Sequence, residues 1–310
     1  MEILKNPNFD FLGKARYFIG ASLAVILAGL LFIWTQGIRS GVEFSGGTQL
    51  IVKFERAPEI DKIRDAVSHD APGAVIQTYD AVSKNQVLIR IAGTVQGDID
   101  TAAQRIVDSL SKAYPGNRVL EHSSEVVGPI VGAELRRKAV QLTVLGLVFQ
   151  LVYIAVRFKG AVWGAAATVA VFHDVLVTLG LLAFFRYELT LNVIAALLTL
   201  VGYSVNDTIV IFDRARENLR HKRKDSLTKI LNDSLNQTLT RTLISNGTTF
   251  LAVLGLYLFG GEVLRGFGFA MVVGIVVGTY STIYIASPIV IWWDGVSARR
   301  QGSPKAKAAL

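Results

Sequence analysis

Residues 161–185 read AVWGAAATVAVFHDVLVTLGLLAFF. This apolar run is long enough to cross a bilayer, which takes about 20 mostly apolar residues in a helix. Its ionisable residues are His173 and Asp174, which stand side by side in the middle of the run. Because ionisable groups are costly inside a membrane, the run predicts both a transmembrane helix and a functional position within it.

Five more apolar runs of similar length occur along the chain, so the sequence predicts a polytopic α-helical membrane protein with six transmembrane helices. The first run is too long for a signal peptide and no small-x-small cleavage site follows it, so we interpret it as an uncleaved anchor. The expected spans are Tyr17–Trp34, Ala139–Val156, Ala161–Phe185, Leu189–Phe212, Thr242–Phe259 and Phe267–Trp293.

The composition excludes several other classes of protein. The 310 residues are 51% hydrophobic and only 18% charged, which disfavours a disordered chain or an ordinary soluble enzyme. The chain has 0 Cys, and its 4 His form no HxH or HExxH pair, so we expect no metal and no cofactor. The net charge of +8 is concentrated beside the predicted spans, which favours membrane flanks over nucleic-acid binding.

The distribution of Lys and Arg predicts the orientation of these spans. The N-terminal segment, the loops after the second and fourth spans and the tail together carry 17 of them, whereas the short loops on the other side carry Arg186 and Arg265. Both termini are therefore expected in the cytoplasm and the protein in the inner (plasma) membrane. Arg136, Arg137 and Lys138 lie on the opposite side, but they end a long loop, and long loops largely escape this rule.

That long loop, residues 39–138, is predicted to be an exported domain with a ferredoxin-like α+β fold. It separates residues 1–38, the N-terminus and first span, from the helices of residues 139–293 and the cytoplasmic tail of residues 294–310. Alternating and helical apolar periods give the order βαββαβ. The expected elements are strands over 42–54, 74–82, 86–92 and 118–127, with a break at 45–47 and a turn at 83–85, and helices over 58–68 and 98–113.

Asp207 is the most conspicuous buried charge in the predicted fourth span. It lies about 8 Å inside the expected cytoplasmic end at Phe212, at about 1.5 Å per residue. Arg241 opens the fifth span from the same side, and Ser245, Thr248 and Thr249 follow it on one helical face. Asp207 and Arg241 are therefore candidate functional residues at a similar depth, and a long arginine side chain could span the distance between them. A secondary polar cluster is expected from His173, Asp174, Ser204, Asn206 and Thr208.

Several segments together resemble a known family of membrane proteins. Residues 201–217 read VGYSVNDTIVIFDRARE and residues 127–135 read VGPIVGAEL, and both are similar to signatures of the SecD/SecF family of the bacterial Sec export machinery. The resemblance runs from the first span to about Trp293. Glu43 stands where an Asp is common in the family, and the tail after Asp294 matches nothing we can use. Shorter matches are 46–48, 157–158, 173–174, 178–180 and 241–244.

The resemblance implies membership of the resistance–nodulation–division (RND) superfamily, whose members have two six-helix halves around a proton path. It therefore implies a SecD partner half, association with the SecYEG translocon, and coupling of the proton gradient to late export of unfolded polypeptide. It assigns the proton-carrying role to Asp207 with Arg241 beside it.

Two other functions remain as alternatives at this point. One is half of an RND-type exporter of small molecules or lipids, although a single small exported domain argues against it. The other is an intramembrane aspartyl protease that uses Asp174 and Asp207 as a carboxylate pair. The YD and GxGD motifs of such proteases are absent from this sequence. We therefore expect a non-enzymatic protein.

Overall fold

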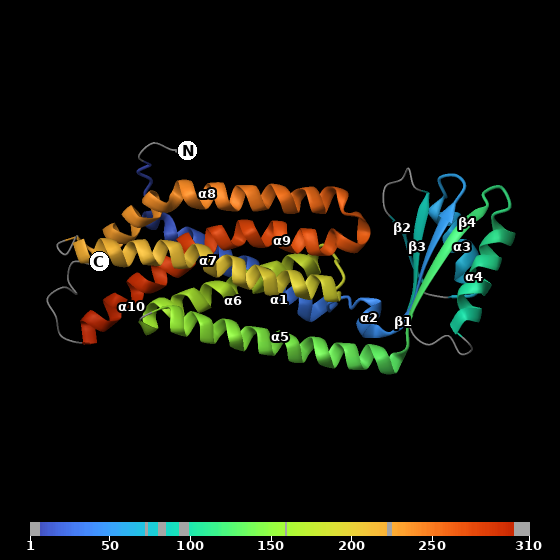
Figure 1. Cartoon of the computed structure of the whole chain (residues 1–310), viewed down its shortest axis with the longest axis horizontal. Coiled ribbons are helices and arrows are strands. Elements are labelled where there is room, and N and C mark those ends of the chain that lie inside the picture. The colour runs from blue at the N-terminus through green and yellow to red at the C-terminus, as the bar shows by residue number, and fades with distance from the viewer. Residues whose placement is uncertain are drawn as a thin grey trace.

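Long apolar helices form one end of the molecule and a small sheet domain forms the other (Figure 1). The computed structural model describes residues 7–71, 74–79, 85–92, 99–158, 160–221 and 225–300. Both ends of this described part lie at the end of the helical bundle that is farthest from the sheet (Figure 1). Residues 83 and 84 of the predicted turn and residues 301–310 of the predicted tail lie outside it.

Six helical segments of the described chain are long and apolar enough to cross a membrane, which confirms the prediction of six spans. The last of them contains two α-helices joined by a single π-helical turn, η3. The helices are α1 (Ala15–Gln36), preceded by the short helix η1 (Leu12–Lys14), then α5 (Pro129–Arg157), α6 (Ala161–Phe184), α7 (Leu191–His221), α8 (Leu227–Phe259), α9 (Gly261–Ser281), η3 (Thr282–Ala286) and α10 (Ser287–Arg300).

Helices α7 and α8 extend well beyond the predicted spans at their shared end. The sequence predicted that the fourth span ends at Phe212 and the fifth begins at Thr242, but α7 continues to His221 and α8 begins at Leu227. The helices therefore continue beyond the apolar runs, and the membrane boundaries along them stay predictions. The extensions are amphipathic: Ile230, Leu231 and Leu235 are buried while charged side chains lie on the outer face.

Helix α5 begins at Pro129 rather than at Ala139. Gly128 takes an extended conformation in front of it and Pro129 occupies its first turn, where a proline is tolerated because no helical N–H is needed. Arg136, Arg137 and Lys138 therefore lie on the helix and not in a loop, and Lys138 pairs with Glu134 one turn earlier. The position of the membrane boundary along this helix stays a prediction.

The sheet domain has the βαββαβ order that the sequence predicts. Its four strands form one antiparallel sheet in the order β2-β3-β1-β4. Helices α3 and α4 pack against this sheet through a core that includes Leu50, Ile63, Ile89 and Leu110. The elements are β1 (Gly47–Phe54), α3 (Ile60–Ser68), β2 (Val75–Tyr79), β3 (Gln86–Ala92), α4 (Ile99–Ala113) and β4 (Val119–Val127).

The start of this domain differs from the prediction. Residues 42–45 were expected to be strand-like, but they form a short helix, α2 (Val42–Ser45), and the strand begins at Gly47. Gly46, with a φ of 70°, turns the chain between the two elements. Its backbone nitrogen would lie only 3.1 Å from a Cβ placed on Gly132 of α5, so glycine at both positions lets α2 pack closely on that helix.

Helix α6 lies inside the bundle and contacts α1, α5, α7 and α9. Its small residues Ala166, Ala167 and Ala170 are completely buried, which allows close helix packing. Large apolar side chains are instead exposed on α1, α5 and α8, as at Leu27, Phe149 and Leu251. This inverted pattern suits a bundle surrounded by lipid rather than by water.

Helices α1 and α6 cross at a contact between Gly29 and Gly180. A Cβ placed on Gly29 would lie 2.8 Å from the Cα of Gly180, so the two backbones touch. Seven residues earlier on each helix, Ser22 and His173 form a hydrogen bond. Seven residues are about two helical turns, so the glycine contact and this polar contact belong to one seam between the helices.

The sheet domain is attached to the bundle through the loop between α6 and α7. Backbone hydrogen bonds join Leu189 in this loop to Arg39 and Gly41. Arg90 on β3 forms an ion pair with Glu188, and both side chains are about four-fifths buried at 19% and 20% exposure. Arg90 also donates to Gln49 on β1. The sheet is therefore coupled to the start of α7 by charge as well as by backbone contacts.

Candidate functional site

Asp174 lies at the centre of a buried polar cluster between four helices. Its carboxylate is 1% exposed. His173 Nδ1 lies 2.9 Å from Asp174 Oδ1, and the hydroxyls of Ser204 on α7 and Ser281 on α9 donate to Oδ2 at 2.5 Å and 2.9 Å. The predicted neighbours His173, Asp174 and Ser204 are thus in direct contact. An ionised oxygen with several donors is the arrangement that makes a buried carboxylate tolerable.

The cluster continues from His173 to α1. His173 Nε2 lies 2.9 Å from Ser22 Oγ, and Ser22 Oγ lies 2.7 Å from the hydroxyl of Tyr280 on α9. The Tyr280 hydroxyl donates to the backbone carbonyl of Phe18 at 2.5 Å. The imidazole ring also stacks on Tyr280, with 6.0 Å between ring centroids. Both ring nitrogens therefore have partners.

Asp207 forms a second centre on α7, separate from the first. Its carboxylate is 5% exposed and accepts a hydrogen bond from the side-chain nitrogen of Asn246 on α8. The same nitrogen donates to Thr279 on α9 at 2.5 Å, and Tyr203 donates to the Asn246 oxygen at 2.9 Å. Asn246 therefore joins three helices around the Asp207 carboxylate.

The two centres are linked along α7 by its helical spacing. Ser204, which donates to Asp174, precedes Asp207 by three residues and so lies almost one turn away on the same side. Thr208 lies 2.9 Å from Thr282 in η3 through their hydroxyls. The π-helical turn begins immediately after Ser281, and such turns are frequent at functional sites. Thr208 is thus part of the polar contact between α7 and η3.

Two predicted residues lie outside these contacts. Arg241 is exposed on α8 and forms no ion pair with Asp207 within the described residues, although their charges interact at longer range. Asn206 is exposed on α7 and has no side-chain hydrogen bond in the described part of the chain. Consecutive residues differ by about 100° around a helix, which turns Asn206 away from the face that holds Asp207.

The sequence analysis missed the partner of Asp207 and, among the partners of Asp174, Ser281. It selected Ser245, Thr248 and Thr249 on the fifth span, but the side chain that reaches Asp207 is Asn246. Thr248 and Thr249 instead donate to carbonyls of their own helix. The sequence did contain a signal for the partners on the last span, because the four polar residues 279–282 interrupt an apolar run. Three of them form hydrogen bonds in the structure: Thr279 with Asn246, Tyr280 with the Phe18 carbonyl of α1, and Ser281 with Asp174.

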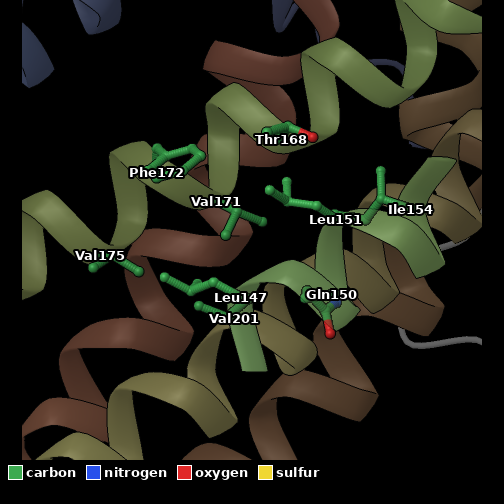
Figure 2. A pocket seen from close by; sticks show the side chains of 9 residues that line it. All are labelled: Leu147, Gln150, Leu151, Ile154, Thr168, Val171, Phe172, Val175 and Val201. Atoms are coloured by element: carbon green, nitrogen blue, oxygen red, sulfur yellow. The ribbon is translucent and has the colours of Figure 1, made fainter. Parts of the chain in front are cut away.

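A pocket between α5, α6 and α7 lies apart from this chemistry (Figure 2). Figure 2 shows aliphatic and aromatic side chains around it, with the uncharged Gln150 and Thr168 at its edges. The absence of charge from its lining excludes it as the proton site. The lining residues are Leu147, Gln150, Leu151, Ile154, Thr168, Val171, Phe172, Val175 and Val201.

No group of three or more metal-ligating side chains occurs within the part of the chain that the structure describes. The polar clusters are therefore built from hydroxyl, amide, imidazole and carboxyl groups. Such groups can bind, share and pass protons. The two acids are not joined to each other by a hydrogen bond: each carboxylate has partners of its own.

Comparison with known proteins agrees with this architecture. Residues 106–296 match the family described as protein export membrane protein SecD/SecF, C-terminal. A protein translocase subunit SecF from Calditerrivibrio nitroreducens is 41% identical over 294 residues, which cover 94% of this chain and 96% of that protein. The chain belongs to the SecF family of protein translocase subunits. A second relative of that name, from Rhodothermus marinus, is 40% identical over 308 residues.

Solved SecDF structures share the fold of this SecF-family chain. The crystal structure of SecDF from a Thermus species, described as a translocon-associated membrane protein, has a TM-score of 0.81 at 36% identity over 93% of this chain. SecDF in a super-membrane-facing form has a TM-score of 0.71 at 35% identity. This chain spans only 39% and 40% of those two chains. It is thus a multi-pass membrane protein that matches a part of SecDF.

Proposed function

We propose that this chain is a proton-driven accessory subunit of the Sec export machinery, with Asp207 as its proton carrier. The observation that carries the proposal is the position of Asp207, a carboxylate 5% exposed among membrane-spanning helices. Its bonded partner is an amide rather than a cation. An intramembrane acid of this kind is a candidate member of a proton relay.

Movement of Arg241 supplies a physical mechanism for loading and release. Burial without a nearby cation favours the protonated form of a carboxylic acid, and an approaching guanidinium favours the ionised form. Arg241 keeps its charge at all relevant pH values. A helix movement that brings Arg241 on α8 toward Asp207 on α7 therefore releases a proton, and the reverse movement allows another to bind.

The proton gradient provides enough free energy for such a cycle. One charge that crosses about 100 mV releases about 2.3 kcal/mol, and each pH unit adds about 1.4 kcal/mol. These amounts suffice for a modest conformational change. Two contacts just before α7 can transmit this movement to the sheet domain: the ion pair of Glu188 with Arg90 on β3, and the backbone hydrogen bonds of Leu189.

The expected partners follow from the names of its relatives. The similar solved chains are SecDF, of which this chain spans about two-fifths, so SecD is the partner half that we propose. The RND organisation, the association with SecYEG and the action on unfolded polypeptide late in translocation belong to the same proposal. Exposed apolar side chains on α1, α5 and α8 leave surfaces for lipid and for a second half.

The proposal places both termini in the cytoplasm of a cell whose inner membrane holds the bundle, with the sheet domain exported. Both ends of the described chain do lie at the end of the bundle away from the sheet (Figure 1). A reporter fused after Leu310 should be cytoplasmic, and one inserted near Asn85 should be exported. The opposite location at either position would contradict this orientation.

Substitution of Asp207 tests the proton-carrying role. Asp207→Asn should abolish proton-dependent export without loss of folding or assembly, and Arg241→Met should do the same. Asp207→Glu should keep part of the activity because a titrating carboxyl group remains. Asp294→Asn removes an exposed carboxylate from α10 and is the matched control. Export at the wild-type rate by Asp207→Asn would exclude Asp207 as the carrier.

The alternative functions receive less support from the geometry. An aspartyl protease needs two carboxylates that share a proton, but Asp174 and Asp207 have separate partners. Exporters of small molecules or lipids usually have more exported domains than the single one found here. The relatives of this chain are also named as protein translocase subunits, which disfavours the exporter alternative. Cleavage of a membrane peptide by the purified protein would reopen the first alternative.

A further inference from the structure

We propose that His173 and Asp174 form a second proton-binding site, which exchanges its proton through Ser22 and Tyr280. The inference rests on the proposed proton-driven function, but it concerns groups that the Asp207 cycle does not use. The four side chains form a continuous series of contacts from α6 to α1 and α9.

Counting the donors at the end of this series determines the direction of each hydrogen bond. The Phe18 carbonyl can only accept, so the one hydroxyl proton of Tyr280 points at it. Ser22 must then be the donor to the Tyr280 oxygen, 2.7 Å away. Because Ser22 has used its only proton, His173 Nε2 must carry a proton and donate it to Ser22 Oγ.

A proton on Nε2 leaves two possible states of the contact between His173 Nδ1 and Asp174 Oδ1, which are 2.9 Å apart. Either the imidazole is doubly protonated and Asp174 is ionised, or the imidazole is neutral and Asp174 carries the proton on Oδ1. Both states place one proton between Nδ1 and Oδ1, and both leave the pair without net charge. Neutrality of the pair is consistent with its depth in the bundle.

Release of one proton from the pair follows directly from this arrangement. His173 gives its Nε2 proton to Ser22, Ser22 passes its own proton to Tyr280, and Tyr280 gives up the proton that pointed at the Phe18 carbonyl, near the start of α1. The proposal requires solvent water that reaches this hydroxyl as the final proton acceptor. His173 is then neutral with its proton on Nδ1, and Asp174 is ionised. Each hydroxyl has gained and lost one proton, and the pair has changed its charge by one unit.

The ionisable surroundings contain no cation bound to the pair within the described residues. Arg157 on α5 is paired with Asp213 on α7, and Arg16 and Tyr17 are exposed at the start of α1. Further ionisable groups on the helices around the pair include Tyr153 on α5, Tyr203 and Asp207 on α7, Tyr280 on α9 and Tyr284 in η3, and charged side chains also lie toward the ends of α5, α7 and α9. A change of charge on the pair therefore acts electrostatically on the neighbouring hydroxyl groups and on Asp207.

The site at His173 and Asp174 is connected to Asp207 through Ser204. Ser204 donates to Asp174 from α7, less than one turn from Asp207. When the pair becomes negative, that hydroxyl is held more strongly, because hydrogen bonds to an ionised acceptor are about twice as strong as neutral ones. Proton exchange at His173 and Asp174 thus acts on the helix that carries Asp207 and tightens the contact between α6 and α7.

Nuclear magnetic resonance of the full chain in lipid vesicles tests the inference directly. With isotope-labelled histidine, His173 is assigned among the 4 His by its loss in His173→Gln. We expect Nε2 to carry a proton at low pH and to lose that proton as the pH is raised. An Nε2 that is unprotonated throughout, or one that keeps its proton throughout, overturns the proposal.

Variants distinguish a proton site from a structural clamp. Asp174→Asn and Ser22→Ala each remove one partner of the ring, so each should change the pH at which Nε2 loses its proton. Thr178→Val is the matched control on α6, because its hydroxyl is fully buried but has no hydrogen-bond partner among the described residues. An unchanged titration in both test variants, or an equal change in the control, contradicts the inference.

Export measurements separate this inference from the Asp207 proposal. In Asp207→Asn, the titration of His173 should persist although proton-dependent export is lost. In Tyr280→Phe, which removes the last hydroxyl of the series, we expect loss of proton-dependent export with retention of assembly. Wild-type export by Asp207→Asn refutes the Asp207 role alone, whereas wild-type export by Tyr280→Phe refutes the second site alone.

Discussion

Asn246 donates a hydrogen bond to Asp207, and this contact joins α8 to the one acid among the buried residues of α7. Both hydrogens of the Asn246 amide are used, one on Asp207 and one on Thr279, and its oxygen accepts from Tyr203. The orientation of the amide is therefore determined by its partners. A relative movement of α7, α8 and α9 that separates these side chains breaks at least one of these bonds.

Replacing Asn246 with leucine should uncouple proton use from export. Asn246→Leu keeps a similar volume but removes three interhelical hydrogen bonds, each worth about 0.6 kcal/mol on average in a membrane protein. We expect a loss of about 2 kcal/mol in the free energy of unfolding and a large loss of proton-dependent export. Unfolding in denaturant and export into vesicles with and without a gradient measure the two effects.

Thr248→Val on the same helix is the control for this change, since the Thr248 hydroxyl donates only to carbonyls of its own helix. Export by Asn246→Leu at the level of that control would show that the contact with Asp207 is dispensable.

The ion pair between Arg90 and Glu188 should transmit movement between the bundle and the sheet domain. Arg90→Glu places two like charges together and should lower export, whereas Arg90→Glu combined with Glu188→Arg should restore much of it. For a partly buried pair we expect a coupling free energy of about 1 kcal/mol in a double-mutant cycle. The export rate of the wild type, both single variants and the double variant provides the cycle.

Reversal of Lys53 and Glu121 is the matched control, because that pair lies within the sheet domain and is more exposed at 38% and 73%. Additive effects of the two substitutions at Arg90 and Glu188 would argue against a mechanical role for their contact.

A side chain at Gly29 should separate α1 from α6. In Gly29→Leu the first added carbon would already lie 2.8 Å from the Cα of Gly180, so the backbones must move apart. Overpacking of this kind costs about 1 to 3 kcal/mol. Thermal unfolding measures the loss of stability, and the His173 resonances should report the loss of the contact with Ser22.

Gly20→Leu on the same helix is the control, because a Cβ at Gly20 meets no other atom within 4 Å. Equal thermal stability of the two variants would contradict the close crossing.

Asn232 and Asn236 should hold the segment that precedes α1. Their side chains lie one turn apart on α8, and they exchange hydrogen bonds with the backbone of Phe9 and accept one from Phe11. The double variant Asn232→Ala, Asn236→Ala loses all of these bonds, so trypsin should cleave after Lys14 faster than in the wild type. Fragment mass after timed digestion provides the measurement.

Lys229→Gln, an exposed change near the start of α8, should leave this cleavage rate unaltered. No acceleration in the double asparagine variant would mean that the segment is held by its packed aromatic side chains instead, such as Phe11 against Tyr284.

The sequence by itself was sufficient for the number of spans and for the order of the sheet domain. Apolar runs such as residues 161–185 cannot be accommodated except in a membrane or a large core, and the alternating and helical periods of the domain leave one order of elements. It also indicated that His173, Asp174 and Asp207 are buried ionisable residues, because such a residue inside an apolar run is conspicuous without any knowledge of its neighbours. Their role in proton transfer stays a prediction. The amphipathic ends of α7 and α8 were missed because their burial arises from contact with each other.

Only the tertiary structure decided which side chains meet these residues. Ser22 reaches His173 across 151 positions of sequence, and Asn246 reaches Asp207 across 39. Such pairs depend on how helices rotate and cross. The Gly29–Gly180 contact sets how closely α1 and α6 approach, and the π-helical turn changes which side chains of the last span face α6 and α7. A polar residue in one span has several possible partners in the others, and the packing of the backbones selects among them.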